Sequence, residues 1–269
     1  MCSDRDHGRC MANATRACEE AIARGASLVV LPENYAGIAE GAHRRSWACD
    51  PAAPEHASAI APLLALTTAG SVRVIAGGTP EIADEHRVYN TAFVLGEGRV
   101  LARYRKLHLF DADVPGQPRL RESDGTASGD RAVLVHGPTA AIGLSICYDL
   151  RFAELYRALV EAGAELLAIP SAFTRQTGAA HWEPLVRARA IETQCFVLAA
   201  AQHGEHGGGR SSHGHAMIVD PWGRVLAEAS GGDEVLVADL DPVVLEQART
   251  RVPALRHRID PARLRVEIV

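Results

Sequence analysis

The feature that most constrains the fold is an apolar run, 141–146, that ends abruptly at Cys147. Polar residues follow, and apolar side chains then recur at helical spacing from Phe152 to Val160. The pattern predicts a buried strand, a sharp turn and a helix. Such a turn lifts one side chain out of a rigid sheet. It also leaves free backbone N–H groups, which favour a thiolate and any oxyanion formed beside it.

Cys147 therefore has two interpretations. Free cysteine is among the most buried residue types, and usually it only fills space as a small apolar side chain. The polar and charged residues Tyr148, Asp149 and Arg151 directly after it are unusual for a structural cysteine. They favour a nucleophile, which needs a base and a charge stabiliser from elsewhere in the chain.

The composition indicates one large globular domain over residues 1–269, because 47% of the residues are hydrophobic, 23% are charged and no linker or repeat appears. The formal net charge of −5 argues against nucleic acid or an anionic membrane as a partner. No apolar run approaches the ~18 residues of a membrane span, and the first six residues are too polar for a signal peptide. We expect a cytoplasmic protein.

The six cysteines show no CxxC spacing, so we expect reduced thiols in a reducing compartment. Four of the twelve histidines lie in a glycine-rich segment, 203–215, without Cys, Asp or Glu grouped at metal-ligand spacing. We expect a solvated loop over 204–214 and no metal site.

Two charged residues follow predicted strands. Glu33 comes just after the apolar strand 26–31, and catalytic groups gather at the carboxyl ends of strands in sheets that helices connect. Glu33 is thus a candidate base, although an exposed loop carboxylate is the alternative. Lys106 leaves the strand 100–104 and precedes a long loop that contains Glu122. Lysine is usually a solvated charge, but long structured loops are often functional.

Periodicity and turn residues predict the remaining elements. The alternation indicates helices on the outer face of a sheet whose inner face is buried on a second sheet. The predicted helices are 11–25, 56–69, 152–163, 183–194 and 242–251. The further predicted strands are 72–78, 90–95, 164–170, 196–201, 216–219, 225–227 and 235–239, and 171–182 is predicted to be a loop.

Four separate motifs resemble those of the carbon–nitrogen hydrolase (nitrilase) superfamily, in order and at matching spacing, over residues 10–260. They are Leu31–Asn34, Tyr104–Asp111, Arg121–Asp124 and Ile146–Phe152. Further stretches resemble the branch of deaminated-glutathione amidases, whereas the neighbouring ω-amidase branch shares only part of them. These stretches are Pro170–Thr174, Thr177–Glu183, Arg189–Gln194 and Gly214–Gly223.

The resemblance implies a four-layer αββα sandwich that forms a homodimer or a higher homo-oligomer. It also implies a triad of Glu33, Lys106 and Cys147, with Glu122 as a second glutamate that supports the lysine. In the implied reaction Cys147 attacks a small amide, a thioester forms and ammonia leaves, with no metal or organic cofactor. The Lys106 ammonium and the Tyr148 N–H would stabilise the oxyanion.

Three residues are candidates for substrate binding. Arg151 could grip a substrate carboxylate, since guanidinium binds carboxylates bidentately; the alternative is a salt bridge to Asp149 or Glu154. Thr177 and His181, in the predicted loop after the next strand, are candidates for lining the pocket.

One departure from the family pattern concerns the N-terminus. Family members usually begin with a short apolar strand before the segment that matches residues 1–13, and this chain starts without it. We expect either an upstream start or a sheet that lacks one strand and leaves backbone groups of its neighbour unpaired.

Several functions fit the same triad. The first is an amidase for a small carboxylate-bearing amide such as deaminated glutathione. An ω-amidase acting on α-ketoglutaramate, or a nitrile or N-carbamoyl hydrolase, would differ only in the pocket. A catalytically silent dimeric binding module is the non-enzymatic alternative.

Overall fold

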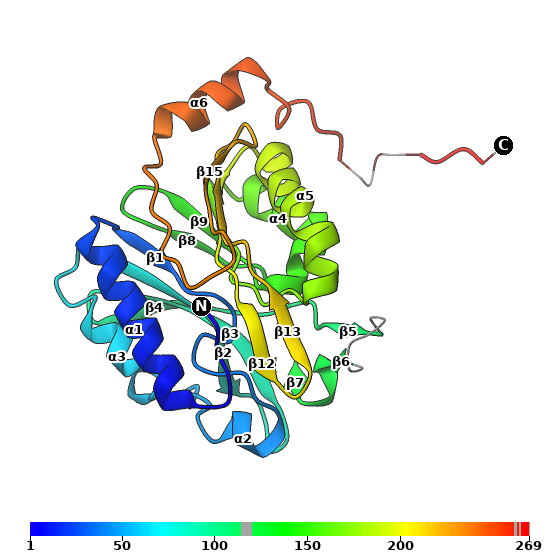
Figure 1. Ribbon diagram of the computed structural model, residues 1–269. Coiled ribbons are helices and arrows are strands. Elements are labelled where there is room, and N and C mark those ends of the chain that lie inside the picture. The colour runs from blue at the N-terminus through cyan, green and yellow to red at the C-terminus, as the bar shows by residue number, and fades with distance from the viewer. Residues whose placement is uncertain (114–119, 261–262, 264, 269) are drawn as a thin grey trace.

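Two β-sheets pack face to face and helices cover their outer faces in the computed structural model, which describes residues 1–113, 120–260, 263 and 265–268 (Figure 1). The αββα sandwich that the resemblance implies is confirmed. The inner faces meet in one core, where Ile75 and Val94 of the first sheet pack in the same cluster as Ile142 and Leu144 of the second.

The first sheet has the strand order β1-β2-β3-β4, with β7 also paired to β3. Its strands are β1 (Leu28–Val30), β2 (Arg73–Ile82), β3 (Val88–Gly96), β4 (Arg99–Arg105) and β7 (Thr126–Ala127). The helices α1 (His7–Ala23) and α3 (Ala61–Ala65) lie on its outer face and share a core cluster with it. The α1 helix begins at its cap Asp6, which accepts from the Arg9 N–H, and Gly25 follows its end with a positive φ of 91°.

The second sheet has the strand order β15-β14-β11-β10-β9-β8. Its strands are β8 (Leu134–His136), β9 (Ala141–Leu144), β10 (Leu166–Ala168), β11 (Phe196–Ala199), β14 (Met217–Val219) and β15 (Val225–Glu228). The three central strands, β9, β10 and β11, are parallel and buried, which explains why they read as continuous apolar runs. The helices α4 (Ala153–Glu161) and α5 (Arg175–Thr193) cover its outer face (Figure 1).

Shorter elements surround one end of the sandwich, and α6 (Pro242–Arg251) extends from the other (Figure 1). The shorter elements are α2 (Gly41–Arg45), β5 (Asp111–Ala112), β6 (Leu120–Arg121), β12 (His203–Gly207), β13 (Arg210–His213) and the 3₁₀ helices η1 (Pro54–His56), η2 (Glu122–Asp124) and η3 (Cys147–Arg151). No helix among the described residues is long and apolar enough to cross a bilayer.

The prediction of a loop over 171–182 is wrong, because α5 begins at Arg175. Thr174 caps this helix by accepting from the Thr177 N–H, and Pro184 is accommodated inside it. Thr177 and His181 are therefore helical residues. The predicted boundary failed because the Gly178-Ala179-Ala180 stretch has no amphipathic pattern, and the helix is stabilised by packing of Trp182 and Val186 in the core.

The predicted loop over 204–214 is also wrong, since β12 and β13 form an antiparallel hairpin there. Gly207 and Gly208 have φ of 83° and 62°, a conformation that a tight turn needs and that glycine adopts without strain. The predicted helix 56–69 shrinks to α3, because Pro62 has no N–H and sits in the first turn, which it starts rather than continues.

The segment 235–239 is not a strand, contrary to the prediction, and within the described residues β1 pairs with β2 alone. A cavity of about 890 Å³ is lined by β1 and by the segment 234–241. The other edge of β1 therefore has no neighbouring strand among the described residues.

A kink in β2 brings the backbone close to Glu33. The pairing of β2 with β3 shifts between Ala76 and Thr79, and Gly78 lies in that kink with a φ of 68°. A Cβ on Gly78 would lie 2.6 Å from Glu33 Cγ and 2.7 Å from Asn34 N. Only glycine fits both the conformation and the space.

We predict that Gly78→Ala lowers the free energy of unfolding by about 3 kcal/mol, the sum of left-handed strain and overpacking. Gly70→Ala is the matched control, because Gly70 has a φ of 76° and nothing within 4 Å of its Cβ position. It should cost only about 1 kcal/mol. Urea unfolding of both variants tests this; equal losses would contradict the close approach to Glu33.

Candidate active site

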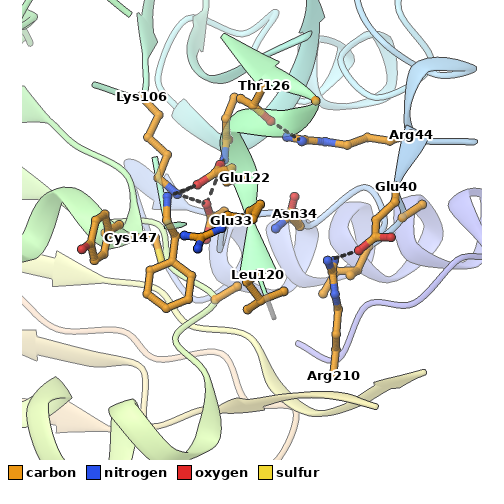
Figure 2. Close-up of a pocket in the computed structure, with 18 of the residues that line it drawn as sticks. Glu33, Asn34, Glu40, Arg44, Lys106, Leu120, Glu122, Thr126, Cys147 and Arg210 are labelled. Atoms are coloured by element: carbon orange, nitrogen blue, oxygen red, sulfur yellow. Dashed lines mark hydrogen bonds and ion pairs between the residues drawn. The ribbon is translucent and has the colours of Figure 1, made fainter. Parts of the chain in front are cut away.

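Three chain segments from both sheets meet at one end of the sandwich. Glu33 follows β1, Lys106 follows β4, and Cys147 follows β9 across the interface. All three line a single cavity of about 820 Å³, together with Glu122 from the 3₁₀ helix η2 (Figure 2). The family resemblance implied these four residues as a group, and the fold brings them together.

Lys106 is held between two carboxylates. Its Nζ lies 3.0 Å from Glu33 Oε1 and 2.8 Å from Glu122 Oε2, and the side chain is only 2% exposed (Figure 2). Burial alone would lower the pKa of the Lys106 amine, but the charges of Glu122 and Glu33 outweigh it and hold that pKa well above its ordinary value. Lys106 is thus a fixed cation at neutral pH.

Glu122 is the counterpart of this cation. Burial alone would raise the pKa of the Glu122 carboxyl, but the Lys106 charge and hydrogen bonds from Lys106 and Asn90 lower it to about 2. The Asn90 side-chain amide donates to both acids, at 2.9 Å from Glu33 Oε1 and 3.0 Å from Glu122 Oε1. Asn90 therefore fixes the relative orientation of the two carboxylates.

Cys147 lies at the sharp turn that the sequence predicted. Its φ is 49°, a strained value for a residue with a side chain, and its N–H donates to the Pro170 carbonyl at 2.8 Å. The residue is 8% exposed and faces the cavity that Glu33 and Lys106 also line. It is the first residue of η3, and the Asp149 N–H two residues later donates to the Ile146 carbonyl at 3.1 Å.

The resting thiol is protonated. Burial and then the Glu33 charge raise the pKa of Cys147 well above its ordinary value, and the Lys106 charge lowers it by less. Lys106 does favour the thiolate, but burial of the sulfur and the Glu33 charge together outweigh it. The thiol needs a neighbouring base at the moment of attack, and Glu33 is in place for that.

A buried carboxylate, Asp149, connects the two segments that carry Lys106 and Cys147. Its Oδ2 accepts from the Tyr104 hydroxyl at 2.6 Å and from the Ile146 N–H at 2.9 Å, and its Oδ1 lies 2.7 Å from His108 Nδ1 and accepts from the His108 N–H at 3.0 Å. Tyr104 and His108 flank Lys106 by two residues on either side. Asp149 therefore sets the spacing between the lysine and the nucleophile.

Arg151 has no acidic partner among the described residues, so the alternative of a salt bridge to Asp149 or Glu154 is not what the structure shows. Its guanidinium carbon lies 5.2 Å from the centre of the Phe173 ring, and Nη1 lies 3.2 Å from His181 Nδ1. Arg151 lines the cavity and leaves its charge available to an anion.

Two of the other three substrate-binding candidates line the cavity, and the third does not. Tyr148 and Thr177 line the cavity, and the Thr177 hydroxyl lies 2.7 Å from that of Thr174. His181 is exposed and does not belong to the cavity wall as described, so the structure places it behind Arg151 instead. The cause is the early start of α5, which turns His181 outward.

The sequence reasoning missed Asn90 and Arg44 of the site, and it missed that Asp149 connects the segments that carry Lys106 and Cys147. Asn90 carried a weak signal, since it is a polar residue that opens an otherwise apolar strand. Asp149 was considered only as a partner of Arg151. Arg44 lies between the predicted strand 26–31 and the predicted helix 56–69, where no local pattern marked it.

A metal finds little support in this donor set, because a buried ammonium stands at its centre. Within the ranges that the structure covers, no three His, Cys, Asp or Glu side chains converge to hold an ion. His206, one of the histidines of the glycine-rich segment, instead bonds the Ser3 carbonyl at 2.7 Å and the Ser212 hydroxyl at 2.8 Å.

Comparisons with known proteins agree with this geometry. The deaminated glutathione amidase of Synechocystis is 42% identical over 249 residues, 89% of this chain and 88% of that protein. The bovine deaminated glutathione amidase is 51% identical over 174 residues, 64% of this chain, and the match spans only about half (53%) of that protein's length.

Among solved structures, Saccharomyces cerevisiae Nit3, described as a member of branch 10 of the nitrilase superfamily, superposes with a TM-score of 0.85 at 29% identity. The superposition covers 98% of this chain and 93% of that one. The sequence profile of the carbon–nitrogen hydrolases matches residues 3–250. With a match over almost the whole chain, the protein belongs to the carbon–nitrogen hydrolase family.

Proposed function

We propose that the protein is a thiol amidohydrolase that cleaves the C–N bond of a small carboxylate-bearing amide through a thioester on Cys147. The observation that carries this proposal is the meeting of an acid, a buried ammonium and a strained cysteine in one open cavity. The names of the most similar relatives support deaminated glutathione as the model substrate.

In the first step Glu33 takes the thiol proton while the Cys147 sulfur attacks the carbonyl carbon. The protonated resting thiol makes this base necessary. The attack forms the S–C bond and moves the carbonyl electron pair onto oxygen. The Lys106 ammonium and the Tyr148 N–H stabilise that oxyanion, an effect typically worth about 3 kcal/mol per donor.

Collapse of this intermediate breaks the C–N bond, and the protonated Glu33 gives its proton to the departing nitrogen. The acyl group remains as a thioester on Cys147. Glu33 then takes a proton from water, whose oxygen attacks the thioester carbon. The C–S bond breaks, Glu33 returns the proton to the Cys147 sulfur, and the carboxylic acid leaves. None of these steps requires a metal or an organic cofactor.

The nitrogen product depends on the amide. A primary amide such as α-ketoglutaramate would release ammonia, as the sequence interpretation supposed. Glutathione contains only secondary amides, so hydrolysis of its deaminated form releases an amine instead. The assay must therefore follow the keto-acid product rather than ammonia alone.

Arg151 is the proposed anchor for a carboxylate on the acyl half of the substrate. Its unpaired guanidinium beside Tyr148 and Phe173 supports this role. An ω-amidase or a nitrile or N-carbamoyl hydrolase would use the same triad. The unpaired arginines of the cavity favour an anionic amide over a neutral nitrile, and the complete triad favours an enzyme over a silent binding module.

We also propose that the protein forms a homodimer and works in the cytoplasm. Ile191 of α5 and Trp222, before β15, are 52% and 49% exposed, and Val225 and Leu226 extend the same apolar surface. Arg187 of α5 donates to the Gly223 carbonyl at 3.0 Å, so helix and turn form one patch. All six cysteines are free, as a reducing compartment would allow.

We predict that Cys147→Ala abolishes hydrolysis of deaminated glutathione and of α-ketoglutaramate, by at least about a thousandfold, with the circular dichroism spectrum unchanged. Cys2→Ala, at a partly exposed thiol outside the cavity, is the control and should retain full activity. The wild-type protein and both variants are also assayed with a simple nitrile and an N-carbamoyl amino acid. Turnover by Cys147→Ala would refute the nucleophile.

We predict that Glu122→Gln moves the alkaline limb of the kcat/KM profile to lower pH. The reason is that Glu122 raises the pKa of Lys106, so its loss lets the ammonium deprotonate earlier. Activity at neutral pH should also fall by about 10- to 100-fold. Asp111→Asn, which removes a charge from the same loop, is the control. An alkaline limb that stays at the same pH would contradict the role of the Lys106 ammonium in stabilising the oxyanion.

We predict that Trp222→Glu converts the dimer to a monomer, because a charge at the centre of the apolar patch would be buried without a partner. Sedimentation velocity measures the change. Arg16→Glu, exposed on α1, changes charge away from the patch and should leave the dimer intact. A monomeric wild-type protein would contradict the proposed assembly.

A further inference from the structure

A second arginine of the cavity, Arg44, carries a charge that no acidic side chain pairs among the described residues. It comes from α2, and its Nη1 donates to the Thr126 hydroxyl at 2.9 Å (Figure 2). This neutral hydroxyl is the only partner of its guanidinium that the described part of the chain provides, and no ion pair engages it there. A partly buried cation held by one neutral group is energetically unfavourable.

Two neighbouring arginines of the cavity have acidic partners. Arg210 pairs with Glu40, and Arg121 Nη2 lies 3.6 Å from Asp113 Oδ2. Arg45, the next residue on α2, also lines the cavity, and it donates to the Arg87 carbonyl at 3.2 Å. Burial lowers the pKa of Arg44, although the charges of Glu122 and Glu33 oppose that change. Arg44 is therefore the cavity arginine that gains most from an added anion.

The chemistry fixes which half of the substrate approaches Arg44. Glu33 must reach the departing nitrogen, so the amine half lies on the Glu33 side of Cys147. Figure 2 shows Arg44 and Arg210 beyond Glu33 and Glu122, on the side away from Cys147. Arg151, by contrast, lies with Tyr148 and Phe173 beside the nucleophile's own turn. The two unpaired guanidinium groups thus face opposite halves of a bound amide.

We propose that Arg44 is a specificity-determining residue that binds a carboxylate on the amine half of the substrate. The inference rests on the proposed amidase function and deepens it. The preferred substrates are secondary amides whose leaving amine is an amino acid or a short peptide with a free carboxylate. Primary amides, which have no amine half, do not use Arg44.

Two substrates that differ in one group test this role. Both carry a 2-oxoglutaryl acyl group joined through its γ-carbonyl, in one case to glycine and in the other to glycinamide. Arg44→Met should lower kcat/KM for the glycine compound by about 10- to 100-fold, the usual cost of a charge-assisted hydrogen bond. The glycinamide compound should change by less than about twofold.

Matched variants complete the design. Arg16→Met removes the same charge from α1, outside the cavity, and should affect neither substrate. Arg44→Lys keeps the charge but loses the planar fork, so it should restore part of the activity on the glycine compound. Arg151→Met should lower activity on both substrates alike, because their acyl halves are identical. Equal losses for both substrates with Arg44→Met would assign Arg44 to the electrostatics of Glu33 and Glu122 and overturn the proposal.

Binding to Cys147→Ala separates the two levels of inference. Calorimetry of this variant should find tighter binding of the glycine compound than of the glycinamide compound, and Arg44→Met in the same background should remove the difference. If the wild-type protein hydrolyses neither compound while this difference persists, the amidase proposal fails and the Arg44 site stands. If turnover occurs without a difference, the Arg44 site fails and the amidase proposal stands.

Discussion

The buried ion cluster of Lys106 with Glu33 and Glu122 is the interaction on which the site depends. An ammonium that is 2% exposed is tolerated only when its charge is paired and hydrogen-bonded. Its two partners come from the end of β1 and from η2, which lies beyond β6 in the chain. Pairing therefore ties three distant segments together at one end of the first sheet. Asn90 completes the cluster by donating to both acids.

The same pairing determines the chemistry available to Cys147. Burial and the Glu33 charge raise the pKa of the neighbouring thiol by more than the Lys106 charge lowers it. The site thus stores a neutral thiol beside a carboxylate base and a fixed cation. In the proposed reaction, charge separates only when the sulfur attacks, and the cation would then already be in place for the new oxyanion. Asp149 keeps these two parts in register across the sheet interface.

The sequence predicted what depends on local pattern. Buried parallel strands read as continuous apolar runs, and the ends of two such runs marked Glu33 and Cys147. Lys106 follows the antiparallel strand β4, and the family resemblance rather than a local pattern gave it a role. Contacts between the sheets left no such signal: Asp149 bonds Tyr104, which lies 45 residues earlier in the chain. The start of α5 was missed because tertiary packing of Trp182 stabilises a stretch without amphipathic pattern. Arg44 was missed because its five-residue helix has no buried residue at all.

The most direct test of the account is intact-mass analysis of the protein after rapid acid quench during turnover of the 2-oxoglutaryl amides of glycine and glycinamide. Both amides should give the same added mass, that of the 2-oxoglutaryl group, on the peptide containing Cys147, since they share one thioester. An adduct that retains the amine, an adduct on another residue, or turnover without any adduct in the presteady state would contradict covalent catalysis at Cys147.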